Sequence, residues 1–349
     1  MKIIFRVDSS LKKGSGHLIR CLTLAKELKK KNIDIKFLCR EEEGNLIDLV
    51  KSSFNVDTLK SINFNEGVSI YEKELYDIEN VTELLKNEKP NLTIIDNYNC
   101  NIEWEKTIAP FSSKIMVIDD FLDREHYCDI FLNQNILEND NTINISKKNT
   151  TLLLGPDFAL MDPIYASHRN LNKKRNKNIS KIFIYFGGSD LYGLSYLTLK
   201  ALTDRIFNEI EVDLVINENT AKLEKIYSIS KFRPKTNIYN RLPHLANLMM
   251  KADLSLGSGG STTWERLCLG LKSIVITSAE NQVYLAKKLN SIGVINLLGD
   301  AKEVDENIIK SAIIDEIDKY ELNNKCIAAM NICDGNGLSR VVNELYNKL

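Results

Sequence analysis

Short apolar runs alternate along the chain with longer segments in which apolar positions recur every three or four residues. The first run, residues 2–7, is rich in branched and aromatic side chains and predicts a β-strand. Residues 18–28 then repeat apolar side chains at helical spacing, with lysine and glutamate on the opposite face. In this half, strands are also predicted at 34–39, 92–96, 114–120, 129–132 and 151–155, and helices at 46–50, 80–87 and 102–111.

The same alternation restarts in the second half with a strand at 181–186. Strands that are apolar on both faces and separated by amphipathic helices indicate a parallel sheet covered on both sides. Further strands are predicted at 213–216, 237–239 and 273–277, helices at 245–250 and 283–290, and a mostly helical stretch at 312–349 with a break at 335–337.

The pattern predicts an α/β protein of two doubly wound, Rossmann-like domains, residues 1–165 and 179–349. Residues 166–178 between them are polar and basic, which fits a linker better than a phosphate-binding patch. Because ligand loops follow the strands in both halves, we expect a site in the cleft between the domains.

Composition narrows the class of protein. With 46 basic and 47 acidic residues among 349, the formal net charge is −1, which gives no general argument for binding nucleic acid or anionic membranes. Seven scattered cysteines without a CxxC pair indicate reduced thiols of a cytoplasmic protein rather than metal ligands. The chain opens into a strand and has no long apolar run, so we expect neither a signal peptide nor membrane insertion.

The loop after the first strand carries the first candidate site. It contains Asp8, Gly14 and Gly16, and it ends with His17 at the start of the predicted helix. Backbone amides at glycines approach a ligand closely, and a histidine at a helix start faces a ligand with which it can exchange protons. A plain glycine turn with a surface histidine is the alternative.

The densest motif, residues 252–267, is predicted as a strand, a glycine-rich turn and a helix capped by Ser261 or Thr262. Such a turn offers N–H groups and hydroxyls to a pyrophosphate, and Glu265 can accept two hydroxyl donors from a ribose. A capping box with Glu265 facing solvent is the alternative. A second glycine turn, Gly187-Gly188-Ser189-Asp190, follows another strand, and Asn281-Gln282 opens a helix with two carboxamides suited to a sugar.

Two families resemble these motifs. Residues 253–271 with Ala279-Glu280-Asn281-Gln282 resemble the nucleotide-binding part of GT-B enzymes related to the lipid II synthase glycosyltransferase. The N-terminal motif is similar, more narrowly, to the UDP-2,4-diacetamido-2,4,6-trideoxy-β-L-altropyranose hydrolases of pseudaminic acid synthesis. That second resemblance rests on residues 5–10, 14–17, 95–98, 118–120, 128–135, 158–160 and 187–190, which cover most of the chain in order.

The resemblance implies cleavage of the bond between the anomeric carbon of a UDP-sugar and UDP, without metal or cofactor. Inversion is expected because His17 and the UDP loops lie on different predicted domains. His17 is implied as the base that activates water. Asp8 and Asp119 are the two candidate acids to orient its imidazole, and the sequence does not choose between them. The residues assigned to the sugar side are Asp8, Gly14, Gly16, Arg20, Tyr98, Asp119, Asn281 and Gln282, and those assigned to UDP are Gly187, Ser189, Gly259, Gly260, Ser261, Thr262 and Glu265.

The chain departs from the family pattern twice. Asp162 follows the Ala-Leu pair where a basic residue is usual, and Lys272 follows Gly270-Leu271 where proline is usual. A GT-B glycosyltransferase with a UDP-sugar donor is the main alternative, a hydrolysing 2-epimerase and a non-catalytic UDP-sugar sensor the others. A UDP-sugar is the only partner we expect, and the protein is predicted to be a monomer.

Overall fold

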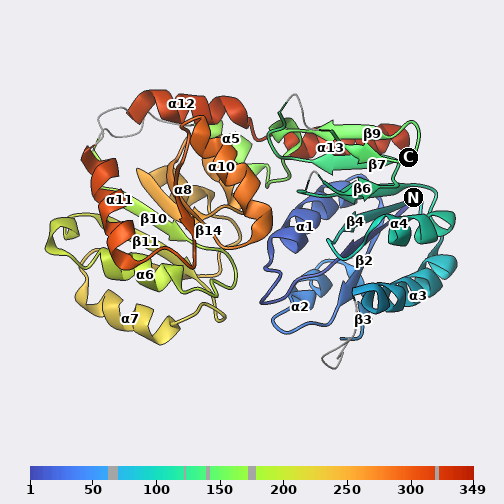
Figure 1. Cartoon of the computed structure of the whole chain (residues 1–349), viewed down its shortest axis with the longest axis horizontal. Helices are drawn as coiled ribbons and strands as arrows, with labels where there is room; N and C mark the ends of the chain where they lie inside the picture. The colour runs from blue at the N-terminus through green and yellow to red at the C-terminus, as the bar shows by residue number, and fades with distance from the viewer. Residues whose placement is uncertain (62–69, 122, 139–141, 172–177, 319–321) are drawn as a thin grey trace. The chain divides into compact units, whose positions relative to one another are not determined.

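The computed structural model describes residues 1–61, 70–121, 123–138, 142–171, 178–318 and 322–349. It divides into two compact units, residues 1–160 with 337–349 and residues 161–336 (Figure 1). Each unit is a parallel sheet with helices on both faces, so the predicted fold class holds for each. None of the helices in these described ranges is both long and apolar enough to cross a membrane.

The sheet of the first unit has seven parallel strands, and β1 (Lys2–Val7) and β4 (Leu92–Asp96) lie side by side at its centre. Strands β2 and β3 follow β1 toward one edge of the sheet, and the chain then crosses to the other side of β1, where β4 begins the second series. The full order is β3 (Asn55–Leu59), β2 (Asp34–Arg40), β1, β4, β5 (Ile115–Ile118), β7 (Ile130–Asn133) and β9 (Thr151–Leu154), and a separate pair joins β6 (Glu125–His126) and β8 (Asn144–Ile145).

Side chains of β1 alternate between two cores, as the period of a strand requires. Ile3, Phe5 and Val7 face the core that also contains α1, α2 and α13, whereas Ile4 faces the core of α3 and α4. The bounds are α1 (Gly16–Lys29), α2 (Ile47–Lys51), α3 (Ile70–Glu88), α4 (Ile102–Ile108) and α13 (Gly337–Lys348).

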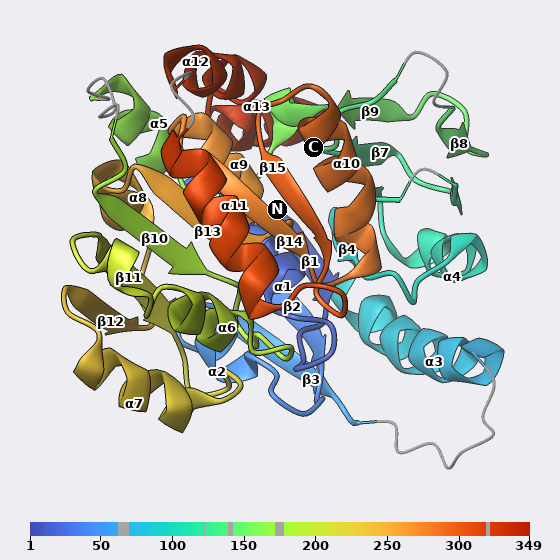
Figure 2. The ribbon, with the colours of Figure 1, turned by 60° about the vertical axis from the view of Figure 1, so that its left-hand side comes forward.

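The second unit repeats this topology with six parallel strands. Figure 2 shows α6 and α11 lying across one face of its sheet, where their apolar side chains join a shared core. The order is β12 (Thr236–Asn240), β11 (Glu211–Ile216), β10 (Lys181–Tyr185), β13 (Leu254–Ser258), β14 (Lys272–Thr277) and β15 (Asn296–Asp300). Its helices are α5 (Ile164–Asn170), α6 (Leu194–Ala201), α7 (Leu223–Phe232), α8 (Ala246–Lys251), α9 (Thr262–Cys268), α10 (Val283–Ser291), α11 (Glu306–Asp318) and α12 (Leu322–Ile332).

Both sheets therefore reverse their strand order once, between β1 and β4 and between β10 and β13. In doubly wound sheets, ligands bind outside the carboxyl ends of the strands at such a switch point. The loops after these strands are the ones that carry the predicted site residues.

The predicted domain division needs a correction at the C-terminus. Helix α13 belongs to the first unit, because Leu338, Val341 and Leu345 are buried in the core of α1. Gly337 makes this close packing possible, since a Cβ there would lie 2.4 Å from the Ala159 carbonyl oxygen. The predicted linker also fails in part, because residues 164–170 form α5 of the second unit, while residues 172–177 lie outside the described residues.

Local predictions match most strands within two residues and miss β3, β6, β8 and β15, of which β15 has only half-buried side chains. Helix α3 begins at Ile70, ten residues before the predicted start. Lys272, in the place of the usual proline, forms a buried ion pair of 2.6 Å with Glu316 on α11, so this departure is structural. No disulfide joins any of the seven cysteines in the part of the chain that the structure describes, and six of them are buried.

Candidate active site

The loop between β1 and α1 places His17 at the switch point of the first unit. The loop closes on itself where the Gly14 N–H donates to the Ser10 carbonyl at 2.9 Å, with Gly14 at a φ of +74° that favours glycine. Helix α1 then begins at Gly16, so His17 occupies its first turn as predicted. Arg20 follows three residues later on the same helix face.

His17 contacts an acid that the sequence analysis missed. Its Nδ1 lies 2.6 Å from Oδ1 of Asp96, the last residue of β4, and 3.1 Å from Nη2 of Arg20. A guanidinium only donates and an ionised carboxylate only accepts, so the short contact requires the proton on Nδ1. This tautomer leaves the lone pair on Nε2, which can then accept a proton.

Asp96 is held in its ionised form by its neighbours. Burial raises the pKa of this fully buried carboxyl, but Arg20 and His17 lower it further, so that the net pKa lies well below the usual range. Arg20 donates from Nε to Asp96 Oδ2 at 2.6 Å and from Nη2 to Oδ1 at 2.7 Å. The Nδ1–H of His17 therefore meets an acceptor that stays charged at neutral pH.

Tyr98 borders the histidine. The two rings meet edge to face with centroids 4.6 Å apart, and the Tyr98 ring also packs on the Phe121 ring with centroids 4.8 Å apart. The Tyr98 hydroxyl donates to Asp120 Oδ2 at 2.6 Å. Burial and the Asp120 charge raise the pKa of Tyr98, so the phenol stays neutral and offers its ring, rather than its committed hydroxyl, to a neighbour.

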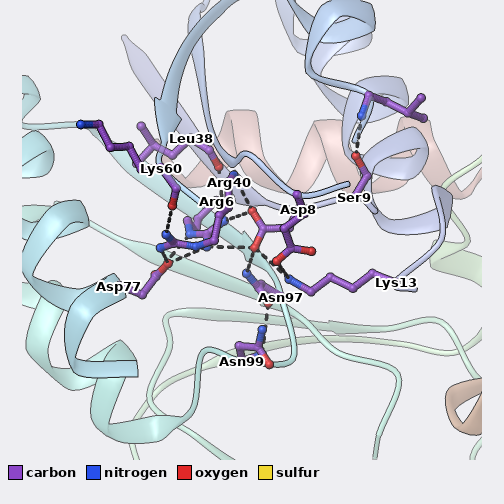
Figure 3. A network of polar contacts seen from close by, with 12 residues as sticks. Arg6, Asp8, Ser9, Lys13, Leu38, Arg40, Lys60, Asp77, Asn97 and Asn99 are labelled. Carbon is purple, nitrogen blue, oxygen red and sulfur yellow. Dashed lines mark hydrogen bonds and ion pairs between the residues drawn. The ribbon is translucent and has the colours of Figure 1, made fainter. Parts of the chain in front are cut away.

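The structure corrects the two acids expected to orient His17. Asp8 belongs instead to a buried ionic network with Arg6, Arg40 and Asp77 (Figure 3). Its Oδ2 also accepts from Asn97 Nδ2 at 2.8 Å and from Lys13 Nζ at 3.3 Å. With both oxygens already engaged, Asp8 supports the loop and the β4 end rather than the imidazole.

Asp119 is likewise engaged elsewhere. It lies 2.8 Å from Arg124 Nη1, and its Oδ2 is 3.3 Å from Nε2 of the buried His126, an ion-pair distance without hydrogen-bond alignment. His126 Nδ1 is 2.7 Å from Glu105. Burial lowers the pKa of His126, but the two carboxylates outweigh it and raise the pKa to about 9, so His126 is a buried cation.

In the second unit, the predicted UDP residues follow β10 and β13, and the predicted sugar-side residues Asn281 and Gln282 follow β14, all at the carboxyl edge of the sheet. The first loop carries Gly187, at a φ of +92°, and Ser189. The N-terminus of α6 behind it is already occupied, because the Asp190 carboxylate accepts from the N–H groups of Leu194 and Ser195 at 2.8 Å each. A phosphate at this loop would therefore contact loop atoms and not the amides that begin α6.

The loop after β13 is shaped by Arg266, which the sequence analysis did not single out. Its Nη2 donates to the Ser258 carbonyl at 2.6 Å and to Thr263 Oγ1 at 3.0 Å. Gly257 leaves room for this guanidinium, since a Cβ there would lie 2.2 Å from Nη1. Ser261 is the N-cap residue of α9 as predicted, but its side chain makes no capping bond, and so the expected hydroxyl cap is absent.

Glu265 does not face open solvent as its alternative interpretation required. Its Oε2 is shielded from water and has no hydrogen-bond partner among the described residues. Burial raises the pKa of Glu265 to about 7, while the neighbouring Tyr165 hydroxyl and Arg266 act in the opposite direction. Asp162, the second departure from the family pattern, is a further acid that raises this pKa.

Gln282 ties two of the loops together. Its Oε1 accepts from the N–H of Gly259 at 3.2 Å and of Ser278 at 3.0 Å. This fixes the amide so that Nε2 is on the Gly260 side, 3.8 Å from where a Gly260 Cβ would stand. Gln282 therefore presents donors beside the glycine turn.

Each unit thus brings its own predicted residues together: Gly14, Gly16, His17, Arg20 and Tyr98 in the first, and in the second the two glycine-containing loops after β10 and β13 with the loop of Asn281 and Gln282 after β14. The prediction from sequence did not assign a site role to four residues that the structure places there: Asp96, Asp120, Tyr165 and Arg266. A signal existed for the two acids, since each stands at or just beyond the end of a buried strand. Within the described ranges, no group of three or more histidine, cysteine or acidic side chains is arranged to hold a metal ion.

Solved structures confirm the fold class as GT-B. MurG of Acinetobacter baumannii matches the whole of both chains at 14% identity with a TM-score of 0.66. A UDP-GlcNAc 2-epimerase of Neisseria meningitidis, bound to UDP-GlcNAc, matches 99% of this chain and 100% of its own at 12% identity and a TM-score of 0.60. At these identities the likeness shows the fold alone.

Sequence relatives confirm the predicted family resemblance. The UDP-2,4-diacetamido-2,4,6-trideoxy-β-L-altropyranose hydrolase of Campylobacter jejuni is 27% identical over 82% of this chain and 97% of its own. The spore coat polysaccharide biosynthesis protein SpsG of Bacillus subtilis is 24% identical over 86% of this chain and 85% of its own. An uncharacterized protein of Methanocaldococcus jannaschii is 29% identical over 81% of this chain, which spans only 57% of that protein. No protein-family model matches the chain.

Proposed function

We propose that this protein is a hydrolase that releases UDP from a UDP-2,4-diacetamido-2,4,6-trideoxyhexose in pseudaminic acid synthesis. The observation that carries the proposal is the His17–Asp96 contact of 2.6 Å at the switch point of the first unit. Pure binding of a UDP-sugar needs no such oriented base, and the similar hydrolase of Campylobacter jejuni supports the sugar class.

In the proposed reaction, His17 Nε2 accepts a proton from water while the water oxygen forms a bond to the anomeric carbon. The bond from that carbon to the β-phosphate oxygen breaks, and its electron pair stays on UDP. The proton then passes from His17 to solvent. Because the water oxygen enters opposite the leaving UDP, the configuration at the anomeric carbon inverts.

UDP is assigned to the second unit. Gly259, Gly260 and the hydroxyls of Ser261 and Thr262 would meet the pyrophosphate, and Gln282, predicted for the sugar side, presents donors beside them. Glu265, with its unpartnered oxygen, is assigned to the ribose hydroxyls. Gly187 and Ser189 remain assigned to UDP through loop atoms, and Asn281 to the sugar side.

The test is UDP release from a panel of UDP-sugars with no acceptor and with EDTA present. We expect rapid release from a UDP-2,4-diacetamido-2,4,6-trideoxyhexose and slow or no release from UDP-GlcNAc. Release that requires an added acceptor would make the protein a glycosyltransferase on the same fold. Activity lost in EDTA and restored by Mg²⁺ or Mn²⁺ would contradict the metal-independent reaction.

A further inference from the structure

Arg20 contacts the proposed catalytic histidine, and Nε, Nη1 and Nη2 of its guanidinium all donate to carboxylates. It is 4% exposed, and it faces a different carboxylate on each side. Nε and Nη2 donate to the two oxygens of Asp96 at 2.6 and 2.7 Å, and Nη1 donates to both oxygens of Asp120 at 2.8 and 2.9 Å. The remaining N–H of Nη2 is directed at His17 Nδ1, 3.1 Å away, so the described contacts direct the Arg20 donors at its neighbours and not at a substrate.

The carboxylates of Asp96 and Asp120 each also bond to one ring residue of the site, His17 and Tyr98 respectively. Asp96 Oδ1 is shared between Arg20 and the Nδ1 of His17, and Asp120 Oδ2 is shared between Arg20 and the hydroxyl of Tyr98. The His17 and Tyr98 rings then touch each other. One guanidinium thus closes a ring of contacts that fixes both side chains.

The fork geometry of arginine matters here. A planar guanidinium can bind two carboxylates at once through parallel N–H groups, whereas an ammonium is a single compact charge. Arg20 also keeps Asp96 ionised, against the burial of that carboxyl. An ionised Asp96 is what requires the proton of His17 to sit on Nδ1.

We propose that Arg20 is a positioning residue that holds His17 in the Nδ1–H tautomer through Asp96 and holds the Tyr98 ring through Asp120. It acts through these two acids and does not touch the substrate. The kinetic part of this inference rests on the proposed hydrolysis; the tautomer part does not.

The kinetic experiment compares Arg20→Lys and Arg20→Ala with the wild type. We expect kcat to fall about 10²-fold in Arg20→Ala, the scale of a misplaced catalytic group, with KM nearly unchanged. Arg20→Lys should recover part of kcat, and guanidinium ion should rescue Arg20→Ala. A raised KM with an unchanged kcat would show that Arg20 binds substrate and would overturn the proposal.

Arg233→Lys is the matched control, because Arg233 is an equally buried arginine that donates to backbone carbonyls in the second unit. It should keep its kcat and should not respond to guanidinium ion. An equal loss of kcat in Arg233→Lys would reduce the Arg20 effect to general destabilisation and overturn the proposal.

A readout without turnover separates this inference from the proposed function. The chain has four histidines, so ¹⁵N spectra can be assigned to His17 by comparison with His17→Gln. We expect a protonated Nδ1 and an unprotonated Nε2 in the wild type, and a mixture of both tautomers in Arg20→Ala, or in Arg20→Lys should the alanine variant not fold. A proton on Nε2 in the wild type, or an unchanged tautomer in the variant, would overturn the proposal whether or not any UDP-sugar is cleaved.

Discussion

Asp96 Oδ1 lies 2.6 Å from His17 Nδ1, although the two residues are 79 positions apart in the sequence. The contact arises because β1 and β4 are neighbours in the sheet, so that the end of β4 reaches the start of the helix that follows β1. We therefore expect a substitution of Asp96 to lower turnover but to have little effect on UDP binding, because the residues assigned to UDP are all in the second unit.

Asp96→Asn replaces the acceptor with an amide that can stabilise either histidine tautomer. We expect kcat to fall by about 10²–10⁴-fold, the range for loss of a properly placed general base, while the Kd for UDP stays the same. Steady-state kinetics and calorimetry measure the two quantities. Asp129→Asn is the control, because Asp129 pairs with Lys147 away from His17 and should keep its kcat.

Tyr98 should act through its ring. Its hydroxyl is committed to Asp120, so Tyr98→Phe removes one hydrogen bond and should change kcat/KM by less than about tenfold. Tyr98→Ala removes the ring against His17 and should cost substantially more. Equal losses in the two variants would mean that the hydroxyl, and not the ring, is what the reaction needs.

Glu265 predicts a pH-dependent affinity for UDP. Its pKa of about 7 means that the ionised form, which accepts hydroxyl donors better, dominates only above neutral pH. Affinity should therefore rise as pH increases through 7, and Glu265→Gln should lose about 1–3 kcal/mol of binding free energy at pH 8 and less at pH 6. Calorimetry measures the Kd for UDP of both proteins, and the ratio of the two Kd values removes the effect of nucleotide titration. A ratio that does not change with pH would contradict the role of Glu265 in binding the ribose.

His126 predicts a loss of stability at alkaline pH. Its folded pKa of about 9 lies above the usual 6.5, so its contribution is fully present below pH 6.5 and is lost as pH rises through 9. The free energy of unfolding should fall by about 3 kcal/mol over this window. Urea titrations of the wild type and of His126→Gln measure it, and a wild-type curve that stays flat from pH 6.5 to 9.5 would refute the buried cation.

Much of this architecture follows from the pattern of the sequence. The strand at 92–96 and the helix beginning near His17 were predictable because apolar periodicity reports local structure. The strand, glycine-rich turn and helix at residues 254–268 were predictable too, because an apolar run, glycines and a helix-capping residue each report local structure. The GT-B resemblance also predicted that the two halves share one type of fold, as their sheets show.

What the sequence did not supply are contacts that depend on strand order. Asp8 and Asp119 looked as suitable for His17 as Asp96 does, and only the β1–β4 adjacency distinguishes them. Asp8 pairs with Arg6 and Asp119 pairs with His126. Arg6 and His126 are charged side chains, and no local sequence pattern predicts that they are buried. Helix α13 was misplaced for the same reason, since its apolar face at Leu338 and Val341 fits either core by composition.

His17 as the base for attack on the anomeric carbon is the central claim, and hydrolysis in ¹⁸O-labelled water tests it most directly. With a UDP-2,4-diacetamido-2,4,6-trideoxyhexose and no acceptor, we predict that the label enters the released sugar, that the anomeric configuration inverts, and that UDP stays unlabelled. His17→Asn should bind the substrate but turn it over about 10²–10⁴-fold more slowly. Label in UDP would mean attack at phosphorus and would contradict the role assigned to His17.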